Sequence, residues 1–511
     1  MEFQLLFKSC CSAAFELVNK EIYFSNTAYN VYLDGKLVIS QCDKNVFSIY
    51  DLQPDTKYKI IVGDYTLDFT TKHASCIMHM SDFSLPEDRT KDITLIMQTA
   101  INILPKDGLL IFDPGEYHFV SLFLKSDITI SLCEGALLLG TTNQDDYPIV
   151  PGEIDCDGKK LQLSTWEGSP EKGKNGLIYS FYQKNIQVVG KGIIDSRGPE
   201  TEFYINHRQK GWARPYLVYL NQCEDVNFHG IEVRNSPSWT YLPYFCNNIG
   251  FYDLMIKNPK DTPNTDGIDP ECSSNIDIIG VHFSVGDDCI AIKSGKIYIG
   301  KTYQVPSKNI TIRNCHMEHG HGGIVLGSEA SAGIKNVTLE RCFFDHTDRG
   351  LRIKSRRGRG KDSVITDIHF LDIRMDGVLT PLVINMFYFC DPDGKTEYVW
   401  SKDKLPVDDR TPYLGNFTFE RITATNAELA LGYFYGLPEQ HIGSIKIKDS
   451  TFTMKENSKK GRPAMMSYID DVANLGFYFN NVENVIFENV TSTGYKGKEV
   501  ILNNVGKIER K

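Results

Sequence analysis

The chain has 511 residues, of which 41% are hydrophobic and 23% charged, with a formal net charge of −10. These values are typical of a globular protein that is long enough for more than one domain. The negative charge argues against a general polyanion-binding surface, and no apolar run is long enough to span a membrane.

The start of the chain, MEFQLLFKSCCSAAFELVNK, lacks the basic region and the continuous apolar core of a secretory signal. Thirteen cysteines without a CxxC pair indicate free, mostly buried thiols. We therefore expect a cytoplasmic protein without a nucleic-acid or membrane partner, or a secreted one if a signal has been removed. The sequence leaves the oligomeric state open.

Residues 1–77 are predicted to form a small β-sandwich. NVYLDGKLVIS, NVFSIYDL and KYKIIVGDYTLDFTT are short alternating strands separated by turn residues. Residues 52–58, LQPDTKY, resemble the loop and tyrosine corner of fibronectin type III domains. We expect a fibronectin type III-like domain, and a purely structural role for it is favoured over a binding role.

Residues 78–511 are predicted to form a second domain that is all-β, a right-handed parallel β-helix. RTKDITLIMQTAINIL can form an amphipathic helix that caps its end. Strand segments of one shared form follow, such as KNIQVVGKGIIDS and KNVTLERCFFDHT, at spacings of 40, 23, 27, 34 and 27 residues. Their opening residues are Asn185, Asp225, Asn248, Asn275, Asn309 and Asn336. Such a repeat, with Asn and Gly at the corners, indicates a β-solenoid, and the consensus of leucine-rich repeats is absent.

Five cysteines keep a constant phase relative to these repeats, which predicts stacked interior ladders instead of disulfides or metal ligands. They are Cys223, Cys246, Cys272, Cys315 and Cys342.

Charged residues about one coil apart are expected to gather on one wall of the solenoid. They are Asp266 in NTDGIDP, Asp287 and Asp288 in SVGDDCIAIKSG, His321 in HGHGG, and Arg352 and Lys354 in RGLRIK. Adjacent aspartates repel each other, and neighbours on an ordinary strand point to opposite faces. We expect Gly286 to supply the backbone freedom for a corner at which both aspartates face the cleft.

Four motifs in this order resemble the polygalacturonases of glycoside hydrolase family 28 over about residues 80–511. They are Asn264-Thr265-Asp266, Gly286-Asp287-Asp288, Gly320-His321-Gly322 and Arg352-Ile353-Lys354, with further matches in NSPSWT at 235–240 and at Tyr388 in VINMFY. The resemblance implies hydrolysis of α-1,4-galacturonosyl linkages in polygalacturonate or pectic oligosaccharides. It also implies inversion, and no metal or other cofactor.

Glycoside hydrolysis needs one protonated carboxyl and one ionised carboxyl, and crowding raises the pKa of at least one of them. The resemblance implies that Asp287 is the general acid, that Asp266 and Asp288 position the water, and that His321 sets the proton state of Asp287. The implied substrate-binding residues are Asn264, Lys293, Arg352, Lys354 and Tyr388. Arg352 and Lys354 would bind a uronate carboxylate.

Other interpretations stay open. The Asp287–Asp288 pair could bind calcium, as in pectate lyases of the same fold, and the histidines 316, 319 and 321 could bind a metal. The basic run at 349–361 could be a solvated loop or a nucleic-acid patch. Rhamnogalacturonan or xylogalacturonan hydrolysis and a non-catalytic, tailspike-like binder are the remaining alternatives.

Long connections at 141–178, 196–213 and 391–411 interrupt the solenoid and are expected to wall its binding face. Together with Lys293, they are similar to the exo-acting bacterial branch of the family. That similarity implies release of sugar from the non-reducing end.

Overall fold

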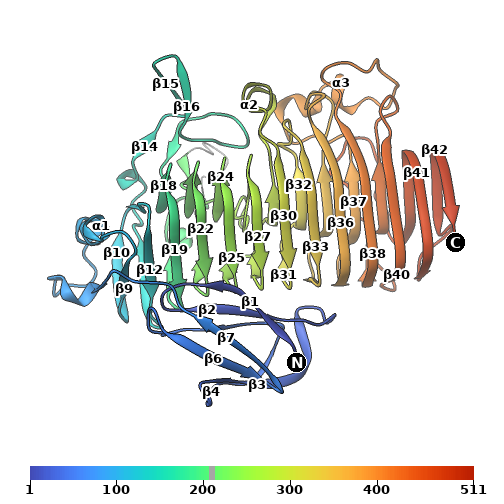
Figure 1. The fold of residues 1–511 in the computed structure, drawn as a ribbon. Helices are drawn as coiled ribbons and strands as arrows, with labels where there is room; N and C mark the ends of the chain where they lie inside the picture. The colour runs from blue at the N-terminus through green and yellow to red at the C-terminus, as the bar shows by residue number, and fades with distance from the viewer. Residues whose placement is uncertain (206–212) are drawn as a thin grey trace.

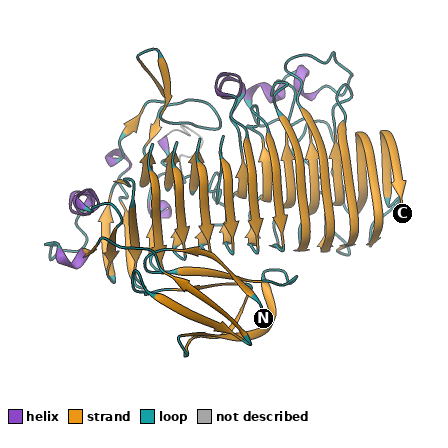
Figure 2. Ribbon diagram, viewed as in Figure 1, coloured by secondary structure: helices purple, strands orange, loops and turns teal. Residues whose placement is uncertain are grey.

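The computed structural model describes residues 1–205 and 213–511. An N-terminal β-sandwich lies against the side of a long solenoid, and the C-terminus is at the far end of that solenoid (Figure 1). Strands dominate both parts (Figure 2). In the described residues, no helix has the length and apolar character needed to cross a membrane.

The sandwich consists of two antiparallel sheets, with strand orders β1-β2-β5 and β4-β3-β6-β7. The strands are β1 (Phe3–Lys8), β2 (Ala13–Leu17), β3 (Phe24–Leu33), β4 (Lys36–Lys44), β5 (Val46–Ile49), β6 (Lys57–Val62) and β7 (Tyr65–Thr70). The Tyr58 hydroxyl accepts a hydrogen bond from the Gln53 amide at 2.8 Å, which is the contact expected of a tyrosine corner. The predicted sandwich is confirmed, whereas its assignment as fibronectin type III stays a prediction.

The solenoid begins with β8 (Cys76–His79), which pairs in parallel with β9 (Gly108–Phe112). This strand straddles the predicted boundary at 77/78, and the division of the chain at that position stays a prediction.

In the described residues, a parallel sheet of 27 strands and a four-stranded parallel sheet, β11-β18-β21-β24, wind together into a right-handed β-helix, as predicted. Its strands form three rows, because each strand pairs with the equivalent strand one coil later. The first row continues with β12 (Ile128–Leu132), β19 (Lys184–Gly190), β22 (Glu224–His229), β25 (Asn247–Tyr252), β27 (Ser274–Ile279), β30 (Ser307–Arg313) and β33 (Ile334–Glu340). The second row contains β10 (Gly115–Phe119), β13 (Ala136–Gly140), β20 (Ile193–Asp195), β23 (Glu232–Arg234), β26 (Met255–Lys257), β28 (His282–Val285), β31 (His316–His319) and β34 (Phe343–Asp345).

Later coils merge these two rows into long strands, β36 (Val364–Asp376), β38 (Tyr413–Ala427), β40 (Ile442–Met454), β41 (Leu475–Thr493) and β42 (Val500–Arg510). The third row contains β11 (Leu122–Phe123), β18 (Ile178–Phe181), β21 (Val218–Asn221), β24 (Tyr241–Tyr244), β29 (Asp288–Ile292), β32 (Gly322–Gly327), β35 (Arg349–Lys354), β37 (Thr380–Asn385) and β39 (Ala430–Tyr435). Between β24 and β29, Ile268 continues this row by bridging to Tyr241 on one side and Ile290 on the other.

Asparagine and aspartate open the coils because the backbone there is left-handed. The six predicted opening residues have φ values between 53° and 57°, a region that Asn and Asp tolerate better than other non-glycine residues. Their side chains also form a ladder, in which Asn336 donates to Asn309 at 2.8 Å and Asn309 donates to Asn275 at 3.0 Å. The repeat predicted from the sequence is therefore confirmed at its corners.

The cysteine ladders are confirmed for four of the five cysteines. The Cys223 amide donates to the Cys246 sulfur and the Cys315 amide to the Cys342 sulfur, both at 3.4 Å. The prediction is wrong for Cys272, because the Cys246 amide donates to the Ser273 hydroxyl at 2.9 Å and Ser273 continues the ladder. All thirteen cysteines are free thiols.

Helix α1 (Thr94–Ile103) lies at the N-terminal end of the solenoid and buries Met97, Ala100 and Ile101, as its amphipathic pattern predicts (Figure 1). A short 3-10 helix, η1 (Met80–Asp82), precedes it.

The long connections gather above the third row, where β15, β16, α2 and α3 rise from the solenoid (Figure 1). The first connection contains η2 (Gln144–Asp146), β14 (Ile149–Val150), β15 (Glu153–Cys156), β16 (Lys159–Gln162) and β17 (Gly173–Lys174). Helix α2 (Ile297–Tyr303) follows β29, and the 391–411 connection contains η5 (Pro392–Lys395) and α3 (Glu397–Trp400). The 196–213 connection contains η3 (Gly198–Glu200), and its residues 206–212 lie outside the described part of the chain.

A buried ion-pair network joins the sandwich to the solenoid. The Glu16 carboxylate accepts hydrogen bonds from Arg313 at 2.7 and 2.9 Å, from Arg341 at 2.8 Å and from Asn314 at 2.7 Å. The Glu16 side chain is fully buried. The two domains therefore share a charged, desolvated contact and are not joined by the chain alone.

Candidate active site

The third row brings all nine predicted site residues to one cleft of about 430 Å³. They are Asn264, Asp266, Asp287, Asp288, Lys293, His321, Arg352, Lys354 and Tyr388. For the aspartates, His321, Arg352 and Lys354 this juxtaposition was predicted from coil spacing, because residues one coil apart stack on the same wall. For Asn264 and Tyr388 it was implied by the family resemblance.

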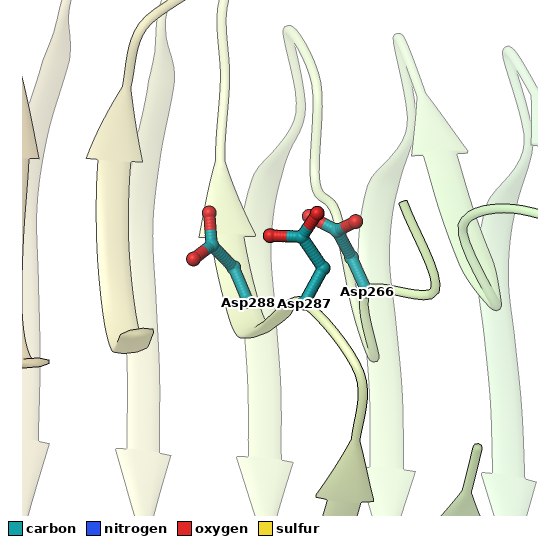
Figure 3. A group of neighbouring side chains, drawn as sticks. All are labelled: Asp266, Asp287 and Asp288. Atoms are coloured by element: carbon teal, nitrogen blue, oxygen red, sulfur yellow. The ribbon is translucent and has the colours of Figure 1, made fainter. Parts of the chain in front are cut away.

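The three aspartates form the centre of the cleft. One carboxylate oxygen of each residue lies within 4.8 Å of one from each of the other two. Asp266 comes from the coil before Asp287 and Asp288, and the three side chains rise on the same side of the solenoid (Figure 3). Asp266 and Asp288 are buried, whereas Asp287 is partly exposed.

Asp287 and Asp288 both face the cleft because the strand begins between them. Asp288 is the first residue of β29, whereas Asp287 belongs to the preceding turn. The amide of Asn264 donates to the Asp287 carboxylate at 3.0 Å and fixes its position.

The expectation that Gly286 supplies backbone freedom is wrong. Its φ lies outside the left-handed region, so backbone freedom is not what the position requires. A Cβ atom there would lie 2.4 Å from the Thr262 carbonyl oxygen and 2.5 Å from the Pro259 carbonyl oxygen. Glycine is needed at this position because the backbones approach closely.

The Asp288 carboxylate lies between two cations from β35. Arg352 donates to one oxygen at 3.1 Å and Lys354 to the other at 2.9 Å. Burial by itself would raise the pKa of Asp288, but Lys354 and Arg352 hold that pKa well below its usual range. Asp288 therefore favours its ionised form.

Asp266 has the opposite environment. Burial, followed by the nearby carboxylates of Asp269 and Asp287, raises the pKa of Asp266 well above its usual value. Its Oδ1 atom is buried without a hydrogen-bond partner among the described residues. The trio therefore combines Asp288, which favours its ionised form, with Asp266, which favours its proton, so its members differ in charge.

His321 lies beside the trio on the next coil. Its amide donates to the Asp287 carbonyl oxygen at 3.0 Å, and its Nδ1 is 2.8 Å from the Asp348 carboxylate. The hydrogen bond with Asp348 raises the pKa of His321 against the opposing effect of burial.

Lys293 lines a second side of the cleft but is already paired. Its ammonium lies 3.4 Å from Asp269 and 3.8 Å from Glu329, and 4.5 Å from the centre of the Trp239 ring. Lys354 similarly lies 5.6 Å from the centre of the Tyr388 ring. The predicted cations are thus present in the cleft, each held by protein partners.

Sequence reasoning missed further residues that line the cleft, namely Glu167, Ser328, Glu329, Asp348, Cys390, Asp391 and Met465. Trp239, which also lines the cleft, could have been predicted from the sequence, because it belongs to the NSPSWT match. Glu167 and Asp391 belong to the long connections, which have no repeat phase from which a wall position could be assigned.

The basic run after β35 is neither a solvated loop nor a nucleic-acid patch. Arg356, Arg357 and Arg359 are buried. Arg356 and Arg359 pair with Asp391, and Arg357 pairs with Glu439. These residues brace the 391–411 connection against the solenoid.

The histidine alternative for a metal site is wrong. His316 stacks between His282 and Phe343 on the second row, with ring centres at 4.5 and 4.9 Å, whereas His321 is on the cleft. Over residues 1–205 and 213–511, the group with metal-ligand spacing is the aspartate trio itself. Arg352 and Lys354 already occupy both oxygens of Asp288, and two fixed cations oppose the entry of a calcium ion.

The fold and the cleft together define a parallel β-helix protein with a glycosidase-type, three-carboxylate active site. Residues 151–427 match the family described as glycosyl hydrolases family 28. The chain belongs to that family.

Two curated relatives have informative names. A probable polygalacturonase from Vitis vinifera is 29% identical over 249 residues, covering 47% of this chain and 49% of that protein. An exo-poly-alpha-D-galacturonosidase from Dickeya chrysanthemi is 26% identical over 306 residues, covering 52% of this chain and 49% of that protein. The matched part of the chain thus spans about half the length of these relatives.

Solved structures share the fold along more of the chain. The family 28 exopolygalacturonase of Yersinia enterocolitica superposes with a TM-score of 0.76 at 19% identity, covering 99% of this chain and 98% of that one. A hyperthermoactive exopolygalacturonase from Thermotoga maritima gives a TM-score of 0.63 at 23% identity, covering 76% and 89%.

Proposed function

We propose that this protein is an inverting polygalacturonase that removes sugar from the non-reducing end of polygalacturonate or its oligomers. The observation that carries the proposal is the aspartate trio packed against Arg352 and Lys354 in one cleft. Glycosidases in general need the carboxylates, and a uronate substrate accounts for the adjacent cations.

In the proposed reaction Asp287 donates its proton to the glycosidic oxygen as the bond from that oxygen to the anomeric carbon breaks. Asp287 suits this role because it is the most exposed of the trio and its carboxylate is oriented by the Asn264 amide. Water attacks the anomeric carbon from the opposite face, and its proton passes to Asp288, the carboxylate that favours its ionised form.

The gap between the carboxylates is shorter than is usual for inversion. Their oxygens lie within 4.8 Å of one another, whereas inverting enzymes generally separate the two carboxyls by about 6.5–9.5 Å. The water is therefore proposed to lie beside Asp266 and Asp288, instead of directly between the acid and the base.

Exo action is supported by the walls of the cleft. Glu167 from the 141–178 connection and Asp391 from the 391–411 connection both line it, so insertions narrow a groove that would otherwise run along the solenoid. The name of the Dickeya relative supports the same mode.

We further propose that the protein acts in a reducing compartment such as the cytoplasm. All thirteen cysteines are free thiols, and Cys390 lines the cleft itself. Short oligogalacturonides would be the substrate available there.

Chromatography of early products from polygalacturonate and from trigalacturonate tests the proposal. We expect one short product to accumulate from the first turnover, with little early fall in viscosity. A ladder of product lengths would exclude exo action, and the absence of any new reducing end would exclude the hydrolase.

A further inference from the structure

A tight turn from the 141–178 connection places a carboxylate in the wall of the cleft. Trp166 and Ser169 exchange two backbone hydrogen bonds, of 2.9 and 3.1 Å, around Glu167 and Gly168. The φ values of these two residues are 46° and 74°, the two-residue turn that normally selects Asn-Gly or Asp-Gly. A left-handed backbone is unfavourable for glutamate, so Glu167 is strained in the first position of the turn. Its side chain lines the cleft.

The turn is fixed from two sides. Below it, Trp166 stacks on Trp239, with ring centres 5.8 Å apart and an interplanar angle of 9°. At its tip, the Lys296 amide donates to the Gly168 carbonyl oxygen at 2.8 Å. A Cβ atom on Gly168 would lie 2.7 Å from the Lys296 nitrogen and 2.8 Å from Glu329. The position of the Glu167 backbone is therefore determined by packing on the solenoid.

The Glu167 carboxylate has spare capacity to accept hydrogen bonds. Its carboxylate lies 3.7 Å from the Lys296 ammonium, and 44% of its side chain is exposed. Glu329 lies on the same side of the cleft and is held by Lys293 and by the Ser328 hydroxyl. Burial and the Glu329 carboxylate raise the pKa of Glu167, which indicates that the two negative groups are close.

The cleft presents charges of both signs to a substrate. Glu167 lines it close to Lys296, which follows β29, and its turn packs on Glu329, which follows β32, whereas Arg349 and Arg352 line it from β35. A galacturonate chain carries one carboxylate on each sugar. Its carboxylates suit the two arginines, whereas the Glu167 carboxylate suits neutral, hydrogen-donating groups.

We propose that Glu167 is a specificity-determining residue that accepts hydrogen bonds from the hydroxyls of the terminal sugar and repels any further uronate. This inference rests on the proposed function and assigns substrate selection at this wall of the cleft to one residue. Glu167 takes no part in bond cleavage. Its negative charge, presented by a rigid turn, makes chain ends better substrates than chain interiors.

The test compares Glu167→Gln with Glu171→Gln at near-neutral pH. Glu171 belongs to the same connection, is exposed and does not line the cleft, so its variant removes the same charge elsewhere. With Glu167→Gln we expect about a tenfold loss of kcat/KM on trigalacturonate, the size of one charge-assisted hydrogen bond. We also expect a greater fall in the viscosity of polygalacturonate per new reducing end. Glu171→Gln should match the wild type in both assays.

A second pair of variants protects the test against misfolding. Glu167→Asp and Glu167→Asn both suit a left-handed backbone and differ only in charge. The Asn variant should cut chain interiors more often than the Asp variant. The inference would be overturned if both variants gave the same fall in viscosity per new reducing end. It would also be overturned if the kinetics of Glu167→Gln equalled those of the wild type. In either case an active wild type would leave the proposed function standing. An inactive wild type would instead contradict the proposed function.

Discussion

Asp288 and Lys354 form a 2.9 Å ion pair across two successive steps of the third strand row, from β29 through β32 to β35. Both side chains are almost fully buried, so neither charge can be hydrated if the other is removed. The pair fixes the protonation state of the proposed base before any substrate arrives. It also means that a uronate carboxylate must share Lys354 and Arg352 with Asp288.

Lys354→Met should therefore change the pH profile as well as the rate. Without Lys354 the pKa of Asp288 rises, so the acidic limb of kcat/KM, which requires ionised Asp288, should move to higher pH. We expect at least about a tenfold loss at the optimum, since a hydrogen bond to a charged group contributes about 1.5–3 kcal/mol. Lys361→Met, an exposed charge on the same segment, is the control. An unshifted acidic limb would remove Lys354 from this role.

Asp287→Asn tests the general acid. Its amide cannot donate a proton to the leaving oxygen, and general acid catalysis contributes about 10²–10⁴-fold. We expect kcat to fall by at least about a hundredfold, with KM nearly unchanged because the ground-state complex does not need the proton. The exposed Asp362→Asn variant is the control. Steady-state kinetics on defined oligogalacturonates is the measurement, and a variant with most of its turnover intact would contradict the assignment.

Asp348→Asn tests how His321 is held. Asp348 raises the pKa of His321, so the imidazolium persists to higher pH in the wild type. Its removal should lower that pKa and move the alkaline limb of kcat/KM to lower pH, if protonated His321 supports the acid. The measurement is the pH profile together with NMR titration of the His321 ring. Asp345→Asn, a carboxylate that pairs with His346, should leave both unchanged.

The fold could be predicted because the residues that mark each repeat are selected by their local backbone conformation. Asn275 and Asn309 open their coils with left-handed backbone, a conformation that selects Asn or Gly whatever the rest of the structure does. The site followed from the same regularity, since coil spacing stacks Asp266, Asp288 and Lys354 on one wall.

The remaining features depend on contacts that no local pattern encodes. The ion pair between Asp288 and Lys354 is a long-range tertiary contact, so the sequence assigned Lys354 to a uronate carboxylate without revealing its bond to Asp288. Glu167 reaches the cleft from an irregular connection whose path is set by packing against Trp239 and Lys296. Gly286 was expected to supply backbone freedom, whereas the crowding by the Thr262 and Pro259 carbonyls becomes visible only in the structure.

Glu16→Gln should destabilise the whole protein. Burial would raise the pKa of Glu16, but Arg313 and Arg341 lower it overall, so the contact stabilises the fold above the unfolded pKa and is lost as pH falls through the folded one. Breaking one partner of a buried ion pair costs about 3–5 kcal/mol, because the arginines are left unpaired. Urea denaturation at neutral pH measures the loss, which should shrink under acidic conditions. The exposed Glu2→Gln variant should unfold like the wild type at every pH.

Excess EDTA should leave the activity unchanged. The aspartate trio has the spacing of a cation site, but both oxygens of Asp288 already accept hydrogen bonds from Arg352 and Lys354. Since those cations are fixed in the cleft, a calcium ion would enter against their repulsion, and the proposed water is activated by carboxylates alone. The measurement follows new reducing ends and ultraviolet absorbance in the same reaction, with and without added calcium. Activity that disappears with EDTA, returns with calcium and forms an ultraviolet-absorbing, unsaturated product would replace hydrolysis by β-elimination.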